Sequence, residues 1–524
     1  MMSTMPTDSG AVTPSANGAS AAGGEERPEH LDVIVIGAGI SGIGTACRVR
    51  IECPEKSLAV LESRDAVGGT WDLFRYPGIR SDSDMFTLGY NFRPWQEARA
   101  IADGPSIRRY VTETAAEYGV DRLIRFGHRV ARAEWSTQDS RWTLEIELPD
   151  GGTKVLTCSY LGCSTGYFDY ARGYSPEFPG ADRFAGSIVH PQHWPEDLDW
   201  EGKRVVVIGS GATAVTIVPS MAAEAEHVTL LQRSPTYMVS RPSVDPLAAW
   251  LKGRLPDRFV FWFMRWWNAL LMVVSFNLMR RFPGRARAVL RRWAVAGLPA
   301  GYDYDRHFEP RYAPWDQRVC LVPDNDLFDA IADGSVSMVT DTIETFTERG
   351  IELSSGEELE ADVIVTATGL ELLVFGGAEI VVDGETIDPA DLVSYKGMMF
   401  SGIPNLVMTM GYTNASWTLK ADLVSEYFCR LIKHTEASGM RQWTPQAPPP
   451  SIEREAFIDL KAGYVLRKLD ELPKQGAVEP WKLRQNYPID VMRLRHGNVE
   501  DEGIEFSAPP AVAAASPEPV AASA

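Results

Sequence analysis

Two segments of the chain share the same order of apolar and polar positions. Each begins with a continuous apolar run, passes through a glycine-rich turn and continues with apolar residues at helical spacing. In the first segment the apolar run is 31–36, the turn is 37–42 and the helix extends to Glu52. In the second segment the apolar run is 204–208, the turn is 209–214 and the helix extends to about Ala225. Apolar runs bounded by turns are typical of strands buried on both faces of a parallel sheet. The pattern predicts an α/β fold with two Rossmann-like dinucleotide-binding domains.

A later apolar strand predicts how the domains are connected. Residues 363–366 (VIVT) are followed by Ala-Thr-Gly, and this strand would return the chain from the second dinucleotide domain to the first. We therefore expect a discontinuous first domain, made of 31–166 and 367–506, around a second domain of 167–366. The stretches 1–30 and 507–524 are rich in Ala, Ser, Pro and Gly or Val, and their composition predicts disordered tails.

The segment from Phe259 to Met279 departs from this alternation, because it is almost entirely apolar and aromatic. It predicts a helical insertion at about 241–312 of the second domain. Residues 251–295 carry nine arginines and one lysine against one aspartate. Two interpretations stay open for 259–293: contact with a membrane surface or a substrate entrance, or an internal helical pair packed on the core. Arg265 and Asn268 interrupt the apolar run and disfavour a full membrane span.

For the membrane interpretation, one face of the second helix of this insertion supplies the apolar surface. Its expected members are Phe282, Ala286, Val289, Leu290 and Trp293, and the arginines Arg281, Arg285 and Arg292 would point elsewhere.

Composition and charge narrow the classes of function. The 524 residues are 45% hydrophobic and 23% charged, which is ordinary for globular proteins. The formal net charge of −19 argues against nucleic acid as a partner, because a phosphate backbone needs a positive surface. The six cysteines form no Cys-x-x-Cys pair, and the start of the chain lacks the pattern of a signal peptide. We expect a cytoplasmic protein without a metal site, peripheral at the inner face of the cell membrane if 259–293 contacts lipid.

The first glycine-rich turn is typical of a dinucleotide site. Gly37 permits the tight turn, Gly39 lets a pyrophosphate approach the backbone at the helix N-terminus, and Gly42 allows close helix–strand packing. Glu62 follows the next strand, where a carboxylate accepts hydrogen bonds from a ribose diol. This context strengthens a motif that is weak when it stands alone.

The second turn predicts a different coenzyme. Its residues are Gly209, Ser210, Gly211, Ala212, Thr213 and Ala214. After its next strand the acid is missing, and Gln232, Arg233 and Ser234 stand there instead. An acid would repel a 2′-phosphate, whereas Arg and Ser can bind one, so this domain should prefer NADPH. The alternative is a surface arginine without a ligand. Together the two domains predict FAD and NADPH as cofactors.

A third motif carries a specific resemblance. Phe184, Gly186, His190, Trp194 and Pro195 fit the pattern F-x-G-x-x-x-H-x-x-x-W-P just before the second turn. With the segments 68–84, 315–323 and 411–422, this pattern resembles type I Baeyer–Villiger flavoprotein monooxygenases over about 29–506. Many members have Lys where this chain has Gln317, which is typical of a divergent subgroup.

The resemblance implies roles for individual residues. FAD would be contacted by Ser41, Glu62, Thr70, Trp71, Asp72, Leu73 and Asp82, and by the backbone around Val130. Arg318 would be the catalytic cation that stabilises developing negative charge, with Asp82 holding its guanidinium. The alternative is an ordinary salt bridge. His190 would act in packing and as a hinge rather than in proton transfer.

The resemblance also implies a reaction. One oxygen atom of O₂ would be inserted into a hydrophobic ketone to give an ester or lactone, or added to a sulfide or thioamide, through a 4a-(hydro)peroxyflavin. One alternative is a monooxygenase of sulfur and nitrogen atoms with little ketone activity, and another is a non-enzymatic flavin- or lipid-binding module. A disulfide reductase is disfavoured because Cys158 and Cys163 stand far from Gly68-Gly69-Thr70, where Trp71 follows. The natural substrate and oligomeric state stay open.

Overall fold

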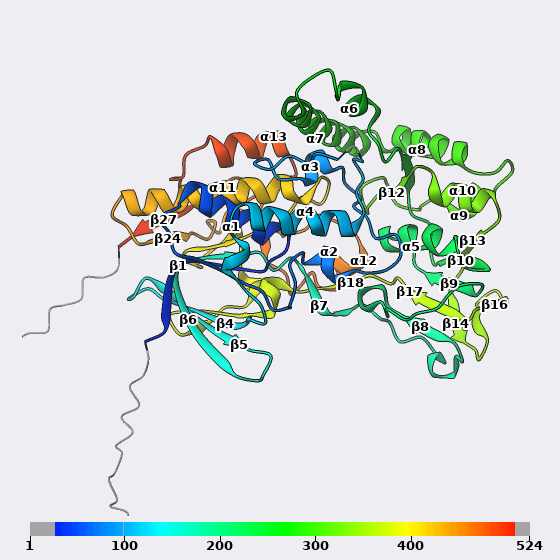
Figure 1. The fold of residues 1–524 in the computed structure, drawn as a ribbon, viewed down its shortest axis with the longest axis horizontal. Helices are drawn as coiled ribbons and strands as arrows, with labels where there is room; N and C mark the ends of the chain where they lie inside the picture. The colour runs from blue at the N-terminus through cyan, green and yellow to red at the C-terminus, as the bar shows by residue number, and fades with distance from the viewer. Residues whose placement is uncertain (1–26, 98, 509–524) are drawn as a thin grey trace, which may run out of the picture.

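Two sheets with parallel strands at their centres organise the chain (Figure 1). This computed structural model describes residues 27–97 and 99–508. Most of each predicted tail, 1–26 and 509–524, lies outside the described residues. The tail boundaries themselves were wrong by a few residues. Strand β1 begins at Glu29, because it pairs with Leu156 on the long strand β6, and β27 ends at Ser507, which pairs with Gln442.

The first sheet runs in the order β20-β19-β4-β5-β6-β1-β2-β3, with β23 also paired to β6. Its strands are β1 (Glu29–Ile36), β2 (Leu58–Leu61), β3 (Ile124–Arg125), β4 (Arg129–Ser136), β5 (Arg141–Glu147), β6 (Thr153–Cys163), β19 (Glu379–Val382), β20 (Glu385–Thr386) and β23 (Leu406–Met408). The last three come from after residue 367. Helices α1 (Ile40–Glu52), α4 (Gly104–Glu117) and α11 (Trp417–Ala437) cover one face with a shared apolar core.

The second sheet is entirely parallel, in the order β13-β10-β9-β17-β8. Its strands are β8 (Ser187–Val189), β9 (Arg204–Ile208), β10 (His227–Gln232), β13 (Val336–Thr340) and β17 (Val363–Thr366). Helices α5 (Ala212–Ala222) and α10 (Asp326–Ala332) pack on one face. The small sheet β14 (Ile343–Phe346), β15 (Gly350–Leu353) and β16 (Glu358–Glu360) packs on the other. The predicted fold class is thereby confirmed.

Short elements connect the two halves. Strand β7 (Phe168–Gly173) pairs antiparallel with β18 (Leu370–Leu372), so the chain leaves and re-enters the first half along one two-stranded ribbon. The remaining elements are α2 (Thr70–Leu73), α3 (Met85–Leu88), α12 (Gly463–Leu466), α13 (Tyr487–Asp490), β21 (Ser394–Tyr395), β22 (Met399–Phe400), β24 (Gln442–Pro445), β25 (Arg454–Ala456), β26 (Lys474–Gly476) and β27 (Ile504–Ser507).

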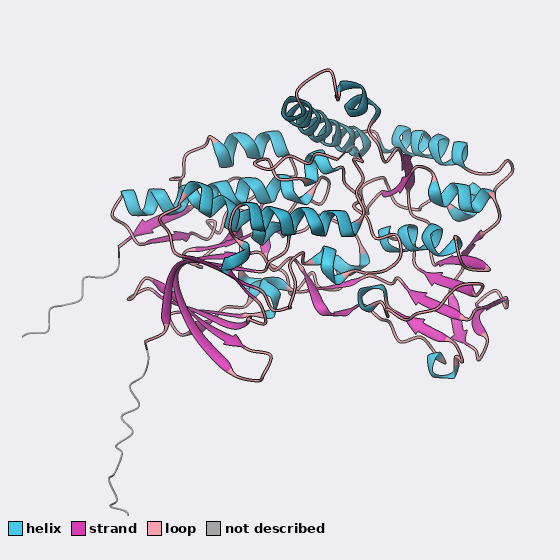
Figure 2. Cartoon of the chain, viewed as in Figure 1, coloured by secondary structure: helices cyan, strands magenta, loops and turns pink. Residues whose placement is uncertain are grey.

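The predicted helical insertion is present between β11 (Met238–Arg241) and its partner β12 (Cys320–Pro323) (Figure 2). It contains α6 (Pro246–Leu251), α7 (Asp257–Arg281), α8 (Pro283–Gly297) and α9 (Tyr304–His307). By length and composition alone, α7 could cross a membrane.

The single apolar face predicted on α8 was wrong. Ala286, Leu290 and Ala294 are buried, whereas Phe282 and Trp293 are exposed. Packing of α8 on the second half buries the face with the small residues and leaves the two aromatic rings outside.

Candidate functional site

The first glycine-rich turn forms a cradle of bare backbone. Gly37 has φ +99°, and a Cβ there would lie 2.6 Å from the carbonyl oxygen of Ser164. A Cβ on Gly42 would lie 1.8 Å from the carbonyl oxygen of Gly37, so the helix packs against the turn as a third glycine allows. Gly39 faces Gly69, where a Cβ would lie 2.9 Å from the Gly39 Cα. These positions fit a dinucleotide pyrophosphate, which needs close approach to the backbone at the start of α1.

Glu62 is held beside this cradle at the carboxyl end of β2. Its carboxylate accepts hydrogen bonds from the backbone N–H of Ala38 at 2.7 Å and of Arg64 at 3.0 Å. The Glu62 carbonyl accepts from the N–H of His128, which brings Val130 close to the same place. Strand β19 pairs with β4 only from Arg132 onward. One backbone edge at Val130 therefore has no strand partner among the described residues, as an adenine contact through the backbone requires.

The predicted contact residues of α2 divide into two groups. Thr70, Trp71 and Leu73 are half-buried near the cradle. The carboxylate of Asp72 is fully buried and forms ion pairs with Arg64 at 2.6 Å, Arg108 at 3.1 Å and Arg75 at 3.5 Å. In this structure Asp72 thus holds arginines around Gly68-Gly69, and its direct contact with FAD stays a prediction.

Ser41 is also engaged by the protein. Its hydroxyl accepts a hydrogen bond from the indole N–H of Trp417 at 2.7 Å. Trp417 begins α11 and stacks on Tyr167, with ring centroids 5.2 Å apart. This contact joins the first turn to the segment that follows β6.

The second turn has the same backbone geometry as the first turn. Gly209 has φ +133°, and a Cβ there would lie 2.4 Å from the Ala367 carbonyl oxygen. No heavy atom of the described residues lies within 4 Å of a Cβ built on Gly211. Gly211 and Ala212 are exposed at the start of α5, Thr213 is half-buried and Ala214 is buried. The bare, open backbone fits a second pyrophosphate.

Equivalent hydrogen bonds align the two units. The N–H of Gly37 donates to Leu61, and the N–H of Gly209 donates to Leu231, so Gln232 occupies the position of Glu62. Gln232 is buried, and its side-chain amide donates to His307 and Thr340. Arg233 and Ser234 are exposed directly after it, and Ser210 donates to the Ser234 carbonyl at 3.2 Å. An uncharged position followed by an exposed cation suits a 2′-phosphate.

Arg318 and Asp82 are brought together from distant segments. A guanidinium nitrogen of Arg318 donates to Asp82 Oδ2 at 3.0 Å, and 40% and 48% of the two side chains are exposed. Burial against the protein opposes the charge of Arg318, but neighbouring Asp82, Tyr167 and Tyr464 raise the pKa of its guanidinium above the usual value. The site therefore presents a fixed cation that stays charged and is still accessible.

The arginine contacts both turns through neighbours. Tyr167, beside Arg318, stacks on Trp417, which donates to Ser41 in the first turn. Cys320, two residues after Arg318, has its thiol 3.8 Å from the Ser210 carbonyl oxygen in the second turn. The cation thus lies where the two nucleotide units meet, and that is where chemistry between two bound dinucleotides would occur.

The third motif contains β8 of the second sheet and contacts β7 of the ribbon between the halves. The Gln192 side chain donates to the Asp169 carbonyl at 2.8 Å, and a Cβ on Gly173 would lie 1.9 Å from the His190 ring. A Cβ on Gly186 would lie 2.3 Å from the Asp362 carbonyl oxygen, while Trp194 packs edge-on against Trp200. Burial lowers the pKa of His190 below its usual value of 6.5, so its ring is neutral at pH 7. Phe184 is half-buried in the same segment, and Pro195 follows Trp194.

Three aromatic residues at the site escaped the residue-by-residue sequence reasoning. Tyr167, Trp417 and Tyr464 surround Arg318 or connect it to the first turn. Trp417 lies in the segment 411–422 that carries part of the resemblance, so that match was its signal. Tyr464, which lies beside the Arg318 guanidinium on α12, had no sequence signal.

The remaining candidate, a redox-active pair of cysteines, does not form a functional site. Cys158 and Cys163 lie on one extended strand, β6, and five residues of strand span about 16 Å, too far for a disulfide. This geometry excludes the disulfide reductase.

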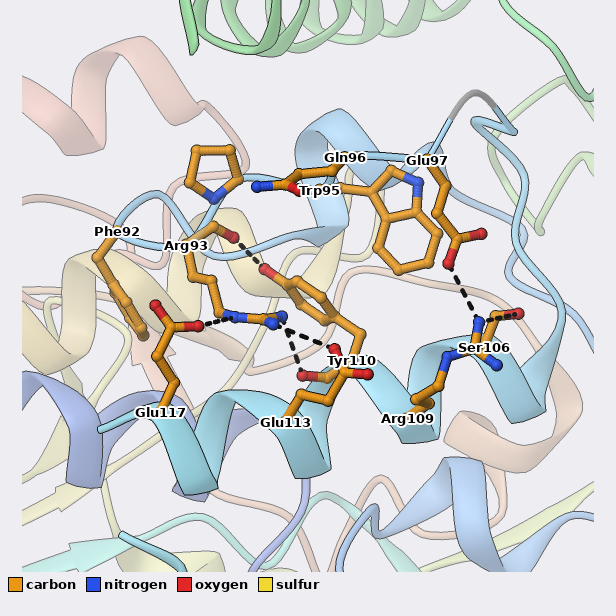
Figure 3. Close-up of a pocket in the computed structure, with 11 residues that line it drawn as sticks. Phe92, Arg93, Trp95, Gln96, Glu97, Ser106, Arg109, Tyr110, Glu113 and Glu117 are labelled. Carbon is orange, nitrogen blue, oxygen red and sulfur yellow. Dashed lines mark hydrogen bonds and ion pairs between the residues drawn. The ribbon is translucent and has the colours of Figure 1, made fainter. Parts of the chain in front are cut away.

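A surface recess of about 310 Å³ lies between α4 and the loop 92–97 (Figure 3). Its cation Arg93 is already paired with Glu113 and Glu117, and Arg109 is paired with Glu97. Among the described residues, no group of three or more His, Cys, Asp or Glu could hold a metal ion.

Comparison with known proteins adds to this geometry. Residues 101–257 match the family described as flavin-binding monooxygenase-like, and residues 35–102 match the NAD(P)-binding Rossmann-like domain. The chain is 54% identical over 484 residues to the FAD-containing monooxygenase EthA of Mycobacterium tuberculosis, covering 92% of this chain and 99% of EthA.

Two solved structures have a similar fold. Steroid monooxygenase bound to NADP has a TM-score of 0.71 at 23% identity and covers 91% of this chain and 99% of its own. Cyclohexanone monooxygenase bound to ε-caprolactone has a TM-score of 0.70 at 22% identity and covers 92% and 100%.

Proposed function

The chain belongs to the family of FAD-containing monooxygenases that includes EthA, and we propose that it uses NADPH and O₂ to oxygenate apolar ketones and organosulfur compounds. The observation that carries the proposal is the Arg318–Asp82 pair at the meeting point of two glycine turns. The overall reaction converts NADPH, H⁺, O₂ and substrate into NADP⁺, water and substrate with one added oxygen atom.

The two halves divide the cofactors between them in this proposal. Residues 31–166 and 367–506 hold FAD at Gly37, Gly39 and Glu62, with the Val130 backbone at the adenine. Bound FAD supplies the redox chemistry, taking a hydride from NADPH and activating O₂. Residues 167–366 hold NADPH on the second turn, where exposed Arg233 and Ser234 receive the 2′-phosphate.

Arg318 is the catalytic cation of the proposal. When a nucleophilic oxygen adds to a ketone, negative charge moves from that oxygen to the carbonyl oxygen. A fixed guanidinium stabilises that charge without reorganising, which is the usual source of the largest rate effects. Asp82 acts as a positioning residue because it bonds to the guanidinium, and Tyr464 lies beside the same group on a different segment.

The lining near Tyr167 favours an apolar substrate. A small cavity there is bordered by Leu372, Met408, Met410 and Phe457. Its free volume is only about 10 Å³, so a substrate must displace side chains to enter. Methionine side chains adapt readily to such changes and also make favourable contacts with aromatic groups. These properties support ketones, sulfides and thioamides over charged substrates.

The main alternative is a monooxygenase of sulfur and nitrogen atoms with little ketone activity. For such a substrate Arg318 would matter less, since no carbonyl oxyanion forms. A non-enzymatic flavin- or lipid-binding module would need neither the second turn nor Arg318. We place the enzyme in the cytoplasm, with 259–293 as the segment that approaches a membrane.

The experiment is a product analysis with the purified yellow holoenzyme. NADPH consumption, hydrogen peroxide and oxygenated products are measured together for an aliphatic ketone, an aryl ketone, a sulfide and a thioamide. We expect both ester and sulfoxide products, at the expense of NADPH. Sulfoxide alone would establish the heteroatom alternative, and absence of substrate-stimulated NADPH consumption would favour the binding module.

A further inference from the structure

Helix α7 has its polar anchors inside and its apolar side chains outside. Arg265 is completely buried, and its guanidinium donates to the carbonyls of Phe86, Thr87 and Gly89 and, at 2.7 Å, to Asp422. Asn268 is buried on the same side. These bonds fix the rotation of α7 about its axis, so its outer face cannot turn inward.

The outer face carries large hydrophobic side chains along the whole helix. We call it the docking face, and its residues, each 41–55% exposed, are Phe259, Phe263, Trp267, Leu270, Leu271, Val274, Leu278 and Phe282. Their spacing of three or four residues places them on one side of the helix over about 35 Å. Single exposed hydrophobics are normal, but a contiguous row of this length marks an interaction surface.

Positive charge flanks the docking face. Arg254, Arg258, Arg281, Arg285 and Arg292 are exposed, and within the described ranges none of them makes an ion pair, unlike Arg280 and Arg291. The guanidinium groups of Arg281 and Arg285 lie 5.3 and 5.5 Å from the ring of Phe282. A net charge of −19 over the chain makes this local cluster stand out. Aromatic and aliphatic side chains bordered by arginine match the surface of an anionic bilayer.

The inner side of the same helix contacts the catalytic segment. Phe276 packs edge-on against Trp315, and the Trp315 indole donates to the sulfur of Met279 at 3.3 Å. Trp315 stands three residues before Arg318 and has φ +70°. A surface bound to the docking face would thus lie against the part of the protein that holds the arginine.

We propose that α7 docks the enzyme on anionic lipid bilayers by inserting the docking face into the interface without crossing it. A crossing helix would expose Arg265 and Asn268 to lipid and lose the bonds to Asp422 and α3. Docking would bring the oxygenating site to a phase in which apolar ketones and sulfides concentrate. The binding itself does not depend on the proposed reaction.

Flotation of the holoenzyme with vesicles tests the proposal. The vesicles contain phosphatidylcholine alone or with one-third phosphatidylglycerol, at low and high salt. The parent should float with anionic vesicles at low salt and less at high salt. The variant L271E/V274E should bind roughly a hundredfold more weakly, because two apolar groups become charged. The control V155E changes a comparably exposed residue of β6, at the opposite side of the molecule, and should bind as the parent does (Figure 1).

A second variant distinguishes loss of docking from misfolding of L271E/V274E. R281Q/R285Q/R292Q keeps the apolar row, and each lost charge should weaken anionic-vesicle binding about fivefold. Turnover of a water-soluble sulfide without vesicles should be unchanged in all variants, which separates loss of docking from loss of the reaction.

Three outcomes overturn the proposal. The parent could fail to float with anionic vesicles, or L271E/V274E could float as well as the parent. Sedimentation could instead show that the parent is an oligomer that does not bind vesicles, and that L271E/V274E is a monomer. The docking face would then cover a second copy of the chain.

Discussion

Replacement of Arg318 by alanine removes the cation that, in the proposed function, stabilises negative charge during oxygen transfer. The substitution deletes a guanidinium bonded to Asp82 at 3.0 Å, with Tyr167 and Tyr464 beside it. Loss of one preorganised donor to developing charge costs about 2.7–4 kcal/mol, a factor of about 100–1,000 in oxygenated product. Because neighbouring Asp82, Tyr167 and Tyr464 raise the arginine's pKa, against the opposing effect of burial, this cation is present at every working pH. The loss should therefore be similar from pH 6 to pH 9.

The assay follows NADPH consumed, hydrogen peroxide released and ester or sulfoxide formed in one reaction. R318A should keep FAD, because Gly37, Gly39 and Glu62 are untouched, and NADPH should still be consumed. The oxygen should then leave mainly as peroxide.

D82N and Y464F serve as graded controls, since each keeps the guanidinium but changes one group beside it. Both should show a milder loss of product per NADPH. R122A, an exposed arginine on the first half, should behave as the parent.

The reasoning fails if R318A forms as much product per NADPH as the parent does. It also fails in part if R318A loses FAD, because the arginine would then be a structural link between the halves. A loss confined to ketones, with sulfides spared, would keep the role of Arg318 but restrict it to carbonyl substrates.

Three further predictions concern the coenzyme, the insertion and His190. R233A should weaken NADPH by roughly ten- to a hundredfold and leave NADH unchanged, since a charge-assisted phosphate contact is worth about 1.5–3 kcal/mol; an unaltered ratio of the two coenzyme efficiencies would refute the assignment. R265M leaves the buried carboxylate of Asp422 without its ion-pair partner and should destabilise the holoenzyme by about 3–5 kcal/mol. The unfolding temperature should fall, and the double variant R265M/D422L should partly restore it. Equal stability of R265M and the parent would contradict the anchoring of α7. Burial lowers the pKa of His190, so the unfolded chain takes up its proton first as the pH falls below about 6.5; the parent's thermal stability should decline there more steeply than that of H190N.

The sequence by itself determined the elements whose causes are local. Helix α1 ends at Glu52 and β17 spans 363–366, as predicted, because a run of apolar residues and the flanking turn specify each one. Gly37 and Gly209 both have a positive φ, which glycine adopts without strain, so the glycine pattern alone predicts the two turns. The contrast between Glu62 and Gln232-Arg233 is likewise a difference of side-chain charge that needs no coordinates.

The tertiary structure decided which further groups, remote in sequence, lie around the Asp82–Arg318 pair that the resemblance implies. Asp82 and Arg318 are 236 residues apart and were expected to meet, whereas Tyr464, which lies beside the same guanidinium, stands on a short helix with no pattern of its own. The resemblance implies that Asp72 contacts FAD, but in the structure its carboxylate forms ion pairs with three arginines. The outer face of α7 is the clearest case. Apolar residues surround much of this helix, and its orientation follows from Arg265, whose partners come from α3, its following loop and α11. Hydrophobic periodicity reports how apolar a face is, but partners remote in sequence decide which face is buried.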